Sequence, residues 1–200
     1  MDAVRVALLR DVLAGTEWPR AARRLAGALR SSVVPQGGGL LLVGTEAYEP
    51  WHLAAHLVDE AAWSGRPELA PTLVRHLVRP GDPAHLAVGL GRLESAGRGS
   101  TLLMVAPERP GAGVLERVHD ARRAGATVLS LDGGDPEVHG LAHEGLTVPA
   151  GAEVDLDTVQ HLVSAAAGEN SLPSPRGRRR LRDRLSLLAD QLTAPPPARW

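Results

Sequence analysis

The stretch Gly97–Leu131, GRGSTLLMVAPERPGAGVLERVHDARRAGATVLSL, decides the fold. It contains two short apolar runs, Thr101–Val105 and Thr127–Leu131, of the kind that form strands buried on both faces. A turn rich in proline and glycine follows the first run and leads into a segment whose apolar residues recur with helical spacing. A strand, a helix and a second strand in this order predict a right-handed β-α-β unit with parallel strands.

The same order occurs earlier, in the stretch Gly37–Leu57, GGGLLLVGTEAYEPWHLAAHL. Its apolar run ends in the strand-terminating Gly44, and the segment Thr45–Trp63 has the periodicity of a helix. A short strand at Leu146–Val148 and a closing helix at Asp157–Ala167 are also expected. Strands that alternate with helices of this length predict a parallel sheet covered by helices on both faces.

The two ends of the chain have simpler patterns. The first thirty residues indicate two helices, and Thr16 is expected to cap the second. We expect one domain over residues 1–168, a linker over 169–175, and an arginine-rich amphipathic helix with a proline-rich tail over 176–200. Six arginines and two aspartates give Arg176–Leu192 a charge of +4.

Composition excludes several classes of protein. The 200 residues carry 22 basic and 23 acidic side chains, so no global charge attracts the chain to nucleic acid or to a membrane. The absence of cysteine excludes disulfides, thiolate metal sites and a cysteine nucleophile. Because we find neither a signal-peptide pattern at the start nor a run of 18 apolar residues, we expect a soluble, cytoplasmic protein.

The two quoted stretches resemble the SIS (sugar isomerase) domain, and within it the phosphoheptose isomerase-like group. The resemblance extends over roughly residues 1–168. It implies a flavodoxin-like, three-layer α/β/α fold with a five-stranded parallel sheet, assembled as a homo-dimer or tetramer with sites at subunit junctions. It also favours a strand near Pro71–Val74 and a helix that begins at about Ala84.

The loops depart from the family pattern. The isomerases carry a Gly-Asn-Gly-Gly-Ser-type loop after the first strand and a Ser/Thr-rich phosphate loop after the third. This chain has GTEAY and APERPG at those places. Two prolines remove amide donors from the second loop, and a glutamate adds a negative charge where a phosphate would bind. The candidate ligand-binding residues are Gly44, Thr45, Glu46, Glu108, Arg109 and Gly111, with Arg109 as an alternative anion holder.

The resemblance also points to the catalytic candidates His56, Glu60 and His161. Isomerases of this family take a carboxylate base from the helix after the first strand and a histidine from the last helix. His56 or Leu57 falls at the carboxylate position, and the histidine position falls near Ala166. We therefore expect that one base survives and that the acid–base pair does not.

Other polar and aromatic residues have structural explanations. His52, His56 and Glu60 stand at i, i+4 and i+8, which fits a metal-ligand set, the polar flank of a packed helix, or histidines at a subunit interface. The packed helix is favoured, so no metal site and no cofactor are assigned. Glu46 and Glu49 are expected to cap the following helix, and His139 and His143 to lie in a loop. The aromatic residues Tyr48, Trp51 and Trp63 are expected in the core, with the lining of a cleft or a subunit contact as the alternative.

Three functions are compatible with these features. The leading hypothesis is a diverged SIS protein that binds a sugar-phosphate-like or other small anionic ligand, or a protein partner, in a regulatory role without efficient catalysis. The second is an active phosphosugar isomerase that interconverts an aldose and a ketose. The third is an oligomeric scaffold that presents the basic segment Arg176–Leu192 to a protein partner, whereas nucleic acid and membrane are not expected partners.

Overall fold

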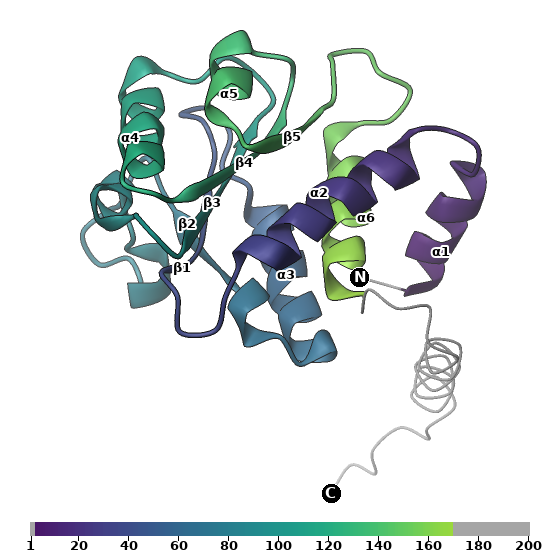
Figure 1. The fold of residues 1–200 in the computed structure, drawn as a ribbon, viewed down its shortest axis with the longest axis horizontal. Coiled ribbons are helices and arrows are strands. Elements are labelled where there is room, and N and C mark those ends of the chain that lie inside the picture. The colour runs from purple at the N-terminus through teal and green to yellow at the C-terminus, as the bar shows by residue number, and fades with distance from the viewer. Residues whose placement is uncertain (1–2, 170–200) are drawn as a thin grey trace, which may run out of the picture. The chain divides into compact units, whose positions relative to one another are not determined.

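The computed structural model describes residues 3–169, which form a five-stranded sheet with helices on both faces (Figure 1). All strands are parallel, and their order is β2-β1-β3-β4-β5. This confirms the predicted three-layer α/β/α architecture, including the strand at Pro71–Val74. The strands are β1 (Gly39–Val43), β2 (Pro71–Val74), β3 (Ser100–Ala106), β4 (Thr127–Asp132) and β5 (Glu144–Thr147).

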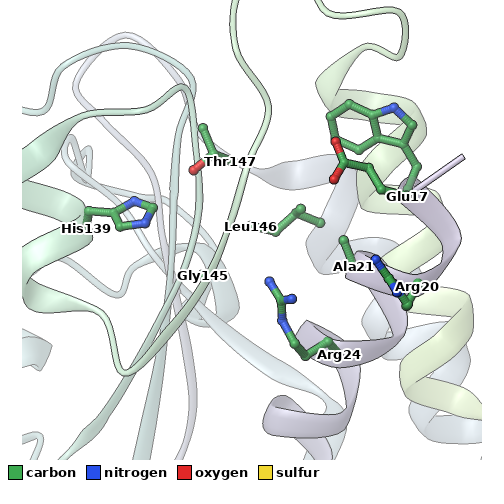
Figure 2. Close-up of a pocket in the computed structure, with 9 residues that line it drawn as sticks. Glu17, Arg20, Ala21, Arg24, His139, Gly145, Leu146 and Thr147 are labelled. Carbon is green, nitrogen blue, oxygen red and sulfur yellow. The ribbon is translucent and has the colours of Figure 1, made fainter.

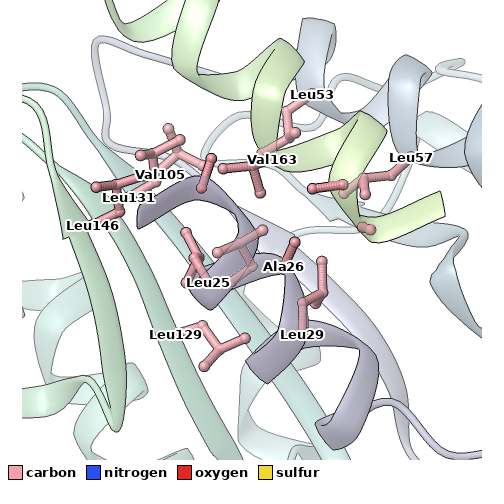
Figure 3. Close-up of a cluster of buried hydrophobic side chains, with 14 of the residues drawn as sticks. Leu25, Ala26, Leu29, Leu53, Leu57, Val105, Leu129, Leu131, Leu146 and Val163 are labelled. Carbon is pink, nitrogen blue, oxygen red and sulfur yellow. The ribbon is translucent and has the colours of Figure 1, made fainter. Parts of the chain in front are cut away.

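Two apolar cores hold the helices to the sheet. Alternate side chains of β1 and β3 point to opposite faces, so Leu40 and Leu103 pack on one side and Leu41 and Leu102 on the other. Figure 3 shows the first core, where Leu25 of α2, Leu57 of α3 and their neighbours meet the strands. Its helices are α1 (Ala3–Val12), α2 (Trp18–Ser32), α3 (Trp51–Ser64) and α6 (Leu156–Gly168). The opposite face carries α4 (Ala112–Arg123), α5 (Pro136–Leu141) and the 3-10 helix η3 (Leu90–Ser95).

The strand order reverses between β1 and β3, and we use the word crevice for the carboxyl ends of these two strands with the loops that follow them. The chain leaves β1 toward β2 on one side and leaves β3 toward β4 on the other. In parallel α/β sheets, ligands bind where the strand order reverses in this way. The register pairs Val43 with Met104, so the loops that begin at Gly44 and Pro107 emerge side by side.

Gly44 is required by a tight turn at this crevice. The Thr45 backbone N–H donates to the Tyr48 carbonyl at 2.9 Å, which folds the loop back on itself. A methyl group on Gly44 would overlap that carbonyl oxygen and approach the ring of Pro50. A side chain therefore cannot be added at Gly44 without moving the loop.

Four local predictions were wrong. The helix expected from about Ala84 is replaced by two 3-10 helices, η2 (Ala84–Leu86) and η3, because the intervening Gly89 disfavours a continuous α-helix. Thr16 does not cap α2, since its hydroxyl donates to the Leu13 carbonyl at 2.8 Å. His139 belongs to the short helix α5, whose N-cap is Asp135.

The fourth concerns the aromatic residues expected in the core. Trp51 and Trp63 are 41% and 50% exposed, whereas Tyr48 does pack against the first core.

None of the helices within residues 3–169 is long and apolar enough to cross a membrane. The predicted linker and arginine-rich helix, residues 170–200, lie outside the described part of the chain.

Candidate functional site

Three histidines from two helices form a cluster beside the strand-end crevice. His52 and His56 lie one turn apart on α3, and His161 comes from α6, which packs along α3 (Figure 1). The ring centroids of His52 and His56 are 4.5 Å apart, and each lies 4.5 to 4.6 Å from the ring of His161. One nitrogen of each ring lies within 4.8 Å of the other two. The two helices thus bring three potential ligand atoms together.

The surroundings of His56 favour its neutral form. Desolvation by burial, together with the neighbouring His161 and His52 rings, lowers the pKa of His56 to about 4. The buried Nε2 of His56 has no hydrogen-bond partner among residues 3–169. A neutral imidazole has one nitrogen lone pair, and an unsatisfied buried polar atom is costly. His56 is therefore suited to donate a lone pair to a bound group.

A chain of polar contacts joins the cluster to the crevice loop. Buried Gln160 donates from Nε2 to the Tyr48 hydroxyl at 2.8 Å and to Asp157 Oδ1 at 3.1 Å. The same Asp157 oxygen lies 3.8 Å from His52 Nδ1. A carboxylate beside the second nitrogen of a metal-binding histidine fixes the orientation of the ring. The contact of Asp157 with His52 could not be predicted from the sequence, because it depends on the packing of α6 against α3.

The three rings fit a transition-metal ion. Zinc binds histidine nitrogen at about 2.0–2.1 Å, which places the ligands of a tetrahedral ion about 3.4 Å apart. The observed nitrogens lie within 4.8 Å of one another, on side chains that are exposed or half-buried. Three histidines leave a fourth position for water or a ligand. The sequence suggested His52, His56 and Glu60 as a metal-ligand set. In the structure the third ligand is His161, because Glu60 lies one helical turn beyond His56, against Gly168.

The predicted ligand-binding loops are bridged by a carboxylate. The buried Thr45 hydroxyl donates to Glu108 Oε1 and accepts from the Tyr48 backbone N–H at 3.1 Å. Glu108 thereby ties the loop after β3 to the loop after β1. Its negative charge thus lies at the carboxyl ends of β1 and β3, where ligands bind in parallel α/β sheets.

A second carboxylate lies at the beginning of α4. A Cβ built on Gly111, the N-cap residue of α4, would be 3.0 Å from Glu46 Oε1. A negative charge at this end of a helix is stabilised by its dipole and free N–H groups. Both glutamates were expected to cap α3, and this prediction was wrong. Glu46 complements α4 instead. Glu49 pairs with Arg75 at 3.1 Å and does not cap α3.

Arg109 contacts carboxylates at the beginning of α5. Its guanidinium pairs with Glu137 at 2.9 Å and lies 3.9 Å from Asp135, both at the beginning of α5. The side chain is 75% exposed. An anion bound by Arg109 would have to compete with these two carboxylates.

A separate hollow of about 270 Å³ lies between α2, α5 and the edge strand β5 (Figure 2). Arg20, Arg24 and His139 face it, but Glu17 lines it too, and Arg24 is paired with Glu144 at 2.9 Å. The charges around this hollow largely cancel. The histidine cluster and the crevice are therefore the stronger candidate site.

Comparison with known proteins identifies the fold. No known family model and no curated protein matches the sequence. A presumed sugar-binding protein from Salmonella typhimurium LT2 matches with a TM-score of 0.52 and 18% identity, over 91% of this chain and 52% of that chain. The chain has the SIS (sugar isomerase) fold. At this identity the likeness concerns the SIS fold, and this chain spans about half of the Salmonella protein.

Two further solved structures are similar to this chain. The sugar isomerase domain of the RpiR transcription factor from Sphaerobacter thermophilus has a TM-score of 0.48 and 13% identity, over 82% of this chain and 86% of that chain. The NanR protein of Vibrio vulnificus, complexed with ManNAc-6P, has a TM-score of 0.47 and 15% identity, over 98% and 77% of the two chains. At these identities both likenesses concern the fold alone, and placement in the phosphoheptose isomerase-like group stays a prediction.

Proposed function

We propose that this chain is a diverged SIS-domain protein that binds a divalent transition-metal ion on His52, His56 and His161, and a small sugar-derived ligand beside it. Its role is regulatory, without efficient isomerisation. The single observation that carries the proposal is the convergence of three imidazole nitrogens to within 4.8 Å. Soft-to-borderline ions such as Zn²⁺ favour imidazole, whereas Mg²⁺ and Ca²⁺ favour oxygen ligands.

The same site argues against efficient proton transfer. Interconversion of an aldose and a ketose needs a base whose pKa lies near the working pH. The pKa of His56 is lowered to about 4 by burial, so this imidazole is a weak base. Glu60, the other candidate on α3, lies against Gly168 rather than among the three rings. Binding is therefore better supported than turnover, although the adjacency of His56 and His161 keeps an active isomerase as the second candidate.

The crevice favours hydroxyl groups over a phosphate. Glu46 lies where the first turn of α4 would otherwise offer its N–H groups to an anion, and Glu108 adds a second negative charge nearby. Carboxylates accept hydrogen bonds from sugar hydroxyls, and the open metal position can take a hydroxyl or carbonyl oxygen. The ligand is thus expected to be recognised mainly through its hydroxyl groups.

Thermal unfolding with zinc and a panel of sugars and sugar phosphates tests the proposed ligand. A sugar present at a hundred times its dissociation constant should stabilise the zinc-loaded chain by about 2.7 kcal/mol. The shift should be absent from a His161→Ala variant, which lacks one metal ligand. A panel that produces no shift in the zinc-loaded native chain would contradict the proposed ligand class.

Replacing Glu46 with alanine should open the N-terminus of α4 to phosphate. Two unit charges about 4 Å apart interact by about 1 kcal/mol in water and about 4 kcal/mol near a protein surface. Because Glu46 is exposed, we expect the lower end of about 1 kcal/mol, which corresponds to a gain of about fivefold in affinity for sugar phosphates. Calorimetric titration checks this, with Glu153→Ala as the control at an exposed carboxylate. Equal affinities of the two variants for sugar phosphates would show that Glu46 does not weaken phosphate binding.

A further inference from the structure

The side chain of Tyr48 has a hydrogen bond left to donate at the crevice. Tyr48 lies on the loop after β1, where it is half-buried and packs against the first core. Its hydroxyl oxygen accepts a hydrogen bond from Gln160 Nε2 at 2.8 Å. A phenol can also donate one hydrogen bond, and within residues 3–169 no acceptor takes the Tyr48 hydrogen. That hydrogen is therefore available to a bound molecule.

The neighbouring amide determines that Tyr48 accepts from Gln160 and does not donate to it. Gln160 Nε2 also lies 3.1 Å from Asp157 Oδ1. Because a carboxylate only accepts hydrogen bonds, the nitrogen of the Gln160 amide must face Asp157. This nitrogen has two hydrogens, one for Asp157 and one for the Tyr48 oxygen. Gln160 is fully buried, so water does not compete for these hydrogens, and the Tyr48 hydrogen points away from Gln160.

The Tyr48 phenol keeps its hydrogen at neutral pH. Burial raises the pKa of Tyr48, the hydrogen bond from Gln160 lowers it, and the nearby carboxylates of Asp157 and Glu108 raise it. The net direction of the pKa is upward. The same two carboxylates make the position beside the hydroxyl unfavourable for an anion. An uncharged oxygen is therefore the better acceptor for Tyr48.

We infer that Tyr48 donates a hydrogen bond to one hydroxyl oxygen of the sugar ligand, with Gln160 as the positioning residue that directs its hydrogen. A sugar hydroxyl fits this position because it can accept from the phenol and donate its own hydrogen to a carboxylate. Glu108 is such a carboxylate, since it and the Tyr48 backbone N–H both bind the Thr45 hydroxyl. This role of Tyr48 rests on the proposed function and adds to it the group that recognises an uncharged part of the sugar.

Calorimetric titration of the zinc-loaded full chain with glucose, fructose and sedoheptulose tests this role. Tyr48→Phe removes the hydroxyl and keeps the ring that packs on the first core. It should lower the affinity for the sugar that binds most tightly by about tenfold, because the sugar hydroxyl loses its donor. The control Thr72→Val removes the hydroxyl of an exposed threonine on the edge strand β2 and should leave this affinity unchanged. Circular dichroism and thermal unfolding establish that each variant is folded.

Monodeoxy analogues of the same sugar separate a direct hydrogen bond from a general disturbance of the site. The analogue that lacks the oxygen bound by Tyr48 should bind the native chain and Tyr48→Phe equally, whereas the other analogues should still bind the variant more weakly. Gln160→Met removes the amide hydrogens that direct the phenol. It should weaken the binding of the parent sugar and leave the binding of that one analogue unchanged.

The outcomes distinguish Tyr48 from the rest of the site. Equal affinity of the native chain and Tyr48→Phe for the parent sugar overturns the role of Tyr48 and leaves the proposed function intact. A loss of the same size for every analogue also overturns this role, because the hydroxyl would then act only through the structure of the loop. A native chain that binds zinc and none of the three sugars overturns the proposed ligand together with the role of Tyr48. Zinc affinity, measured on the same samples, distinguishes failure of the metal site from failure of the sugar site.

Discussion

Replacing His56 with alanine is expected to lower the affinity of the chain for Zn²⁺ by about 100-fold or more. Substitutions that merely disturb the surroundings of a metal ligand cost about 10–100-fold, and loss of a ligand should exceed that range. The remaining rings, His52 and His161, come from different helices and would form a two-coordinate site. Isothermal titration calorimetry in a buffer that does not bind metal measures the change.

His161→Ala should produce a similar loss, although it leaves the pair on α3 intact. The control is His119→Ala, which removes an exposed histidine on α4 outside the cluster. Zinc binding that is unchanged in His56→Ala, or that falls equally in His119→Ala, would show that the ion binds elsewhere. A loss in both cluster variants and not in the control would support a shared site on α3 and α6.

Gly44→Ala should destabilise the fold by roughly 2–4 kcal/mol, through overpacking and strain on the turn hydrogen bond. The added methyl would overlap the Tyr48 carbonyl oxygen, which accepts the Thr45 N–H. Chemical denaturation measures the free energy of unfolding. Gly140→Ala in α5 is the matched control, since a methyl there meets nothing within 4 Å and alanine favours the helix. Equal stability of the two variants would show that the turn tolerates a side chain.

The fold could be predicted because its signals are local. The apolar runs that became β1, β3 and β4 are short, continuous and bounded by glycine, and their strands lie within a residue or two of the predicted positions. The segment from Ala84 failed because its leucines have helical spacing while Gly89 and Gly91 weaken an α-helix. Periodicity shows which residues share a face, and it does not distinguish an α-helix from short 3-10 turns.

The candidate site was only partly predictable. Helical spacing correctly placed His52 and His56 on one face, but position i+8 lies about 80° around the helix from position i, so Glu60 turns away. His161 is 105 residues beyond His56 in the sequence and meets it only through the packing of α6 on α3. The sequence also predicted negative charge in the crevice. It could not show that Glu46 lies against α4 or that Thr45 donates to Glu108.

The central claim is that His52, His56 and His161 bind one transition-metal ion. The most direct measurement is the visible absorption spectrum of the native chain titrated with Co²⁺, whose bands report coordination geometry. We predict the intense bands of a four- or five-coordinate ion, saturating at one equivalent and displaced by Zn²⁺. A spectrum that stays that of the hydrated, six-coordinate ion throughout the titration would contradict the account.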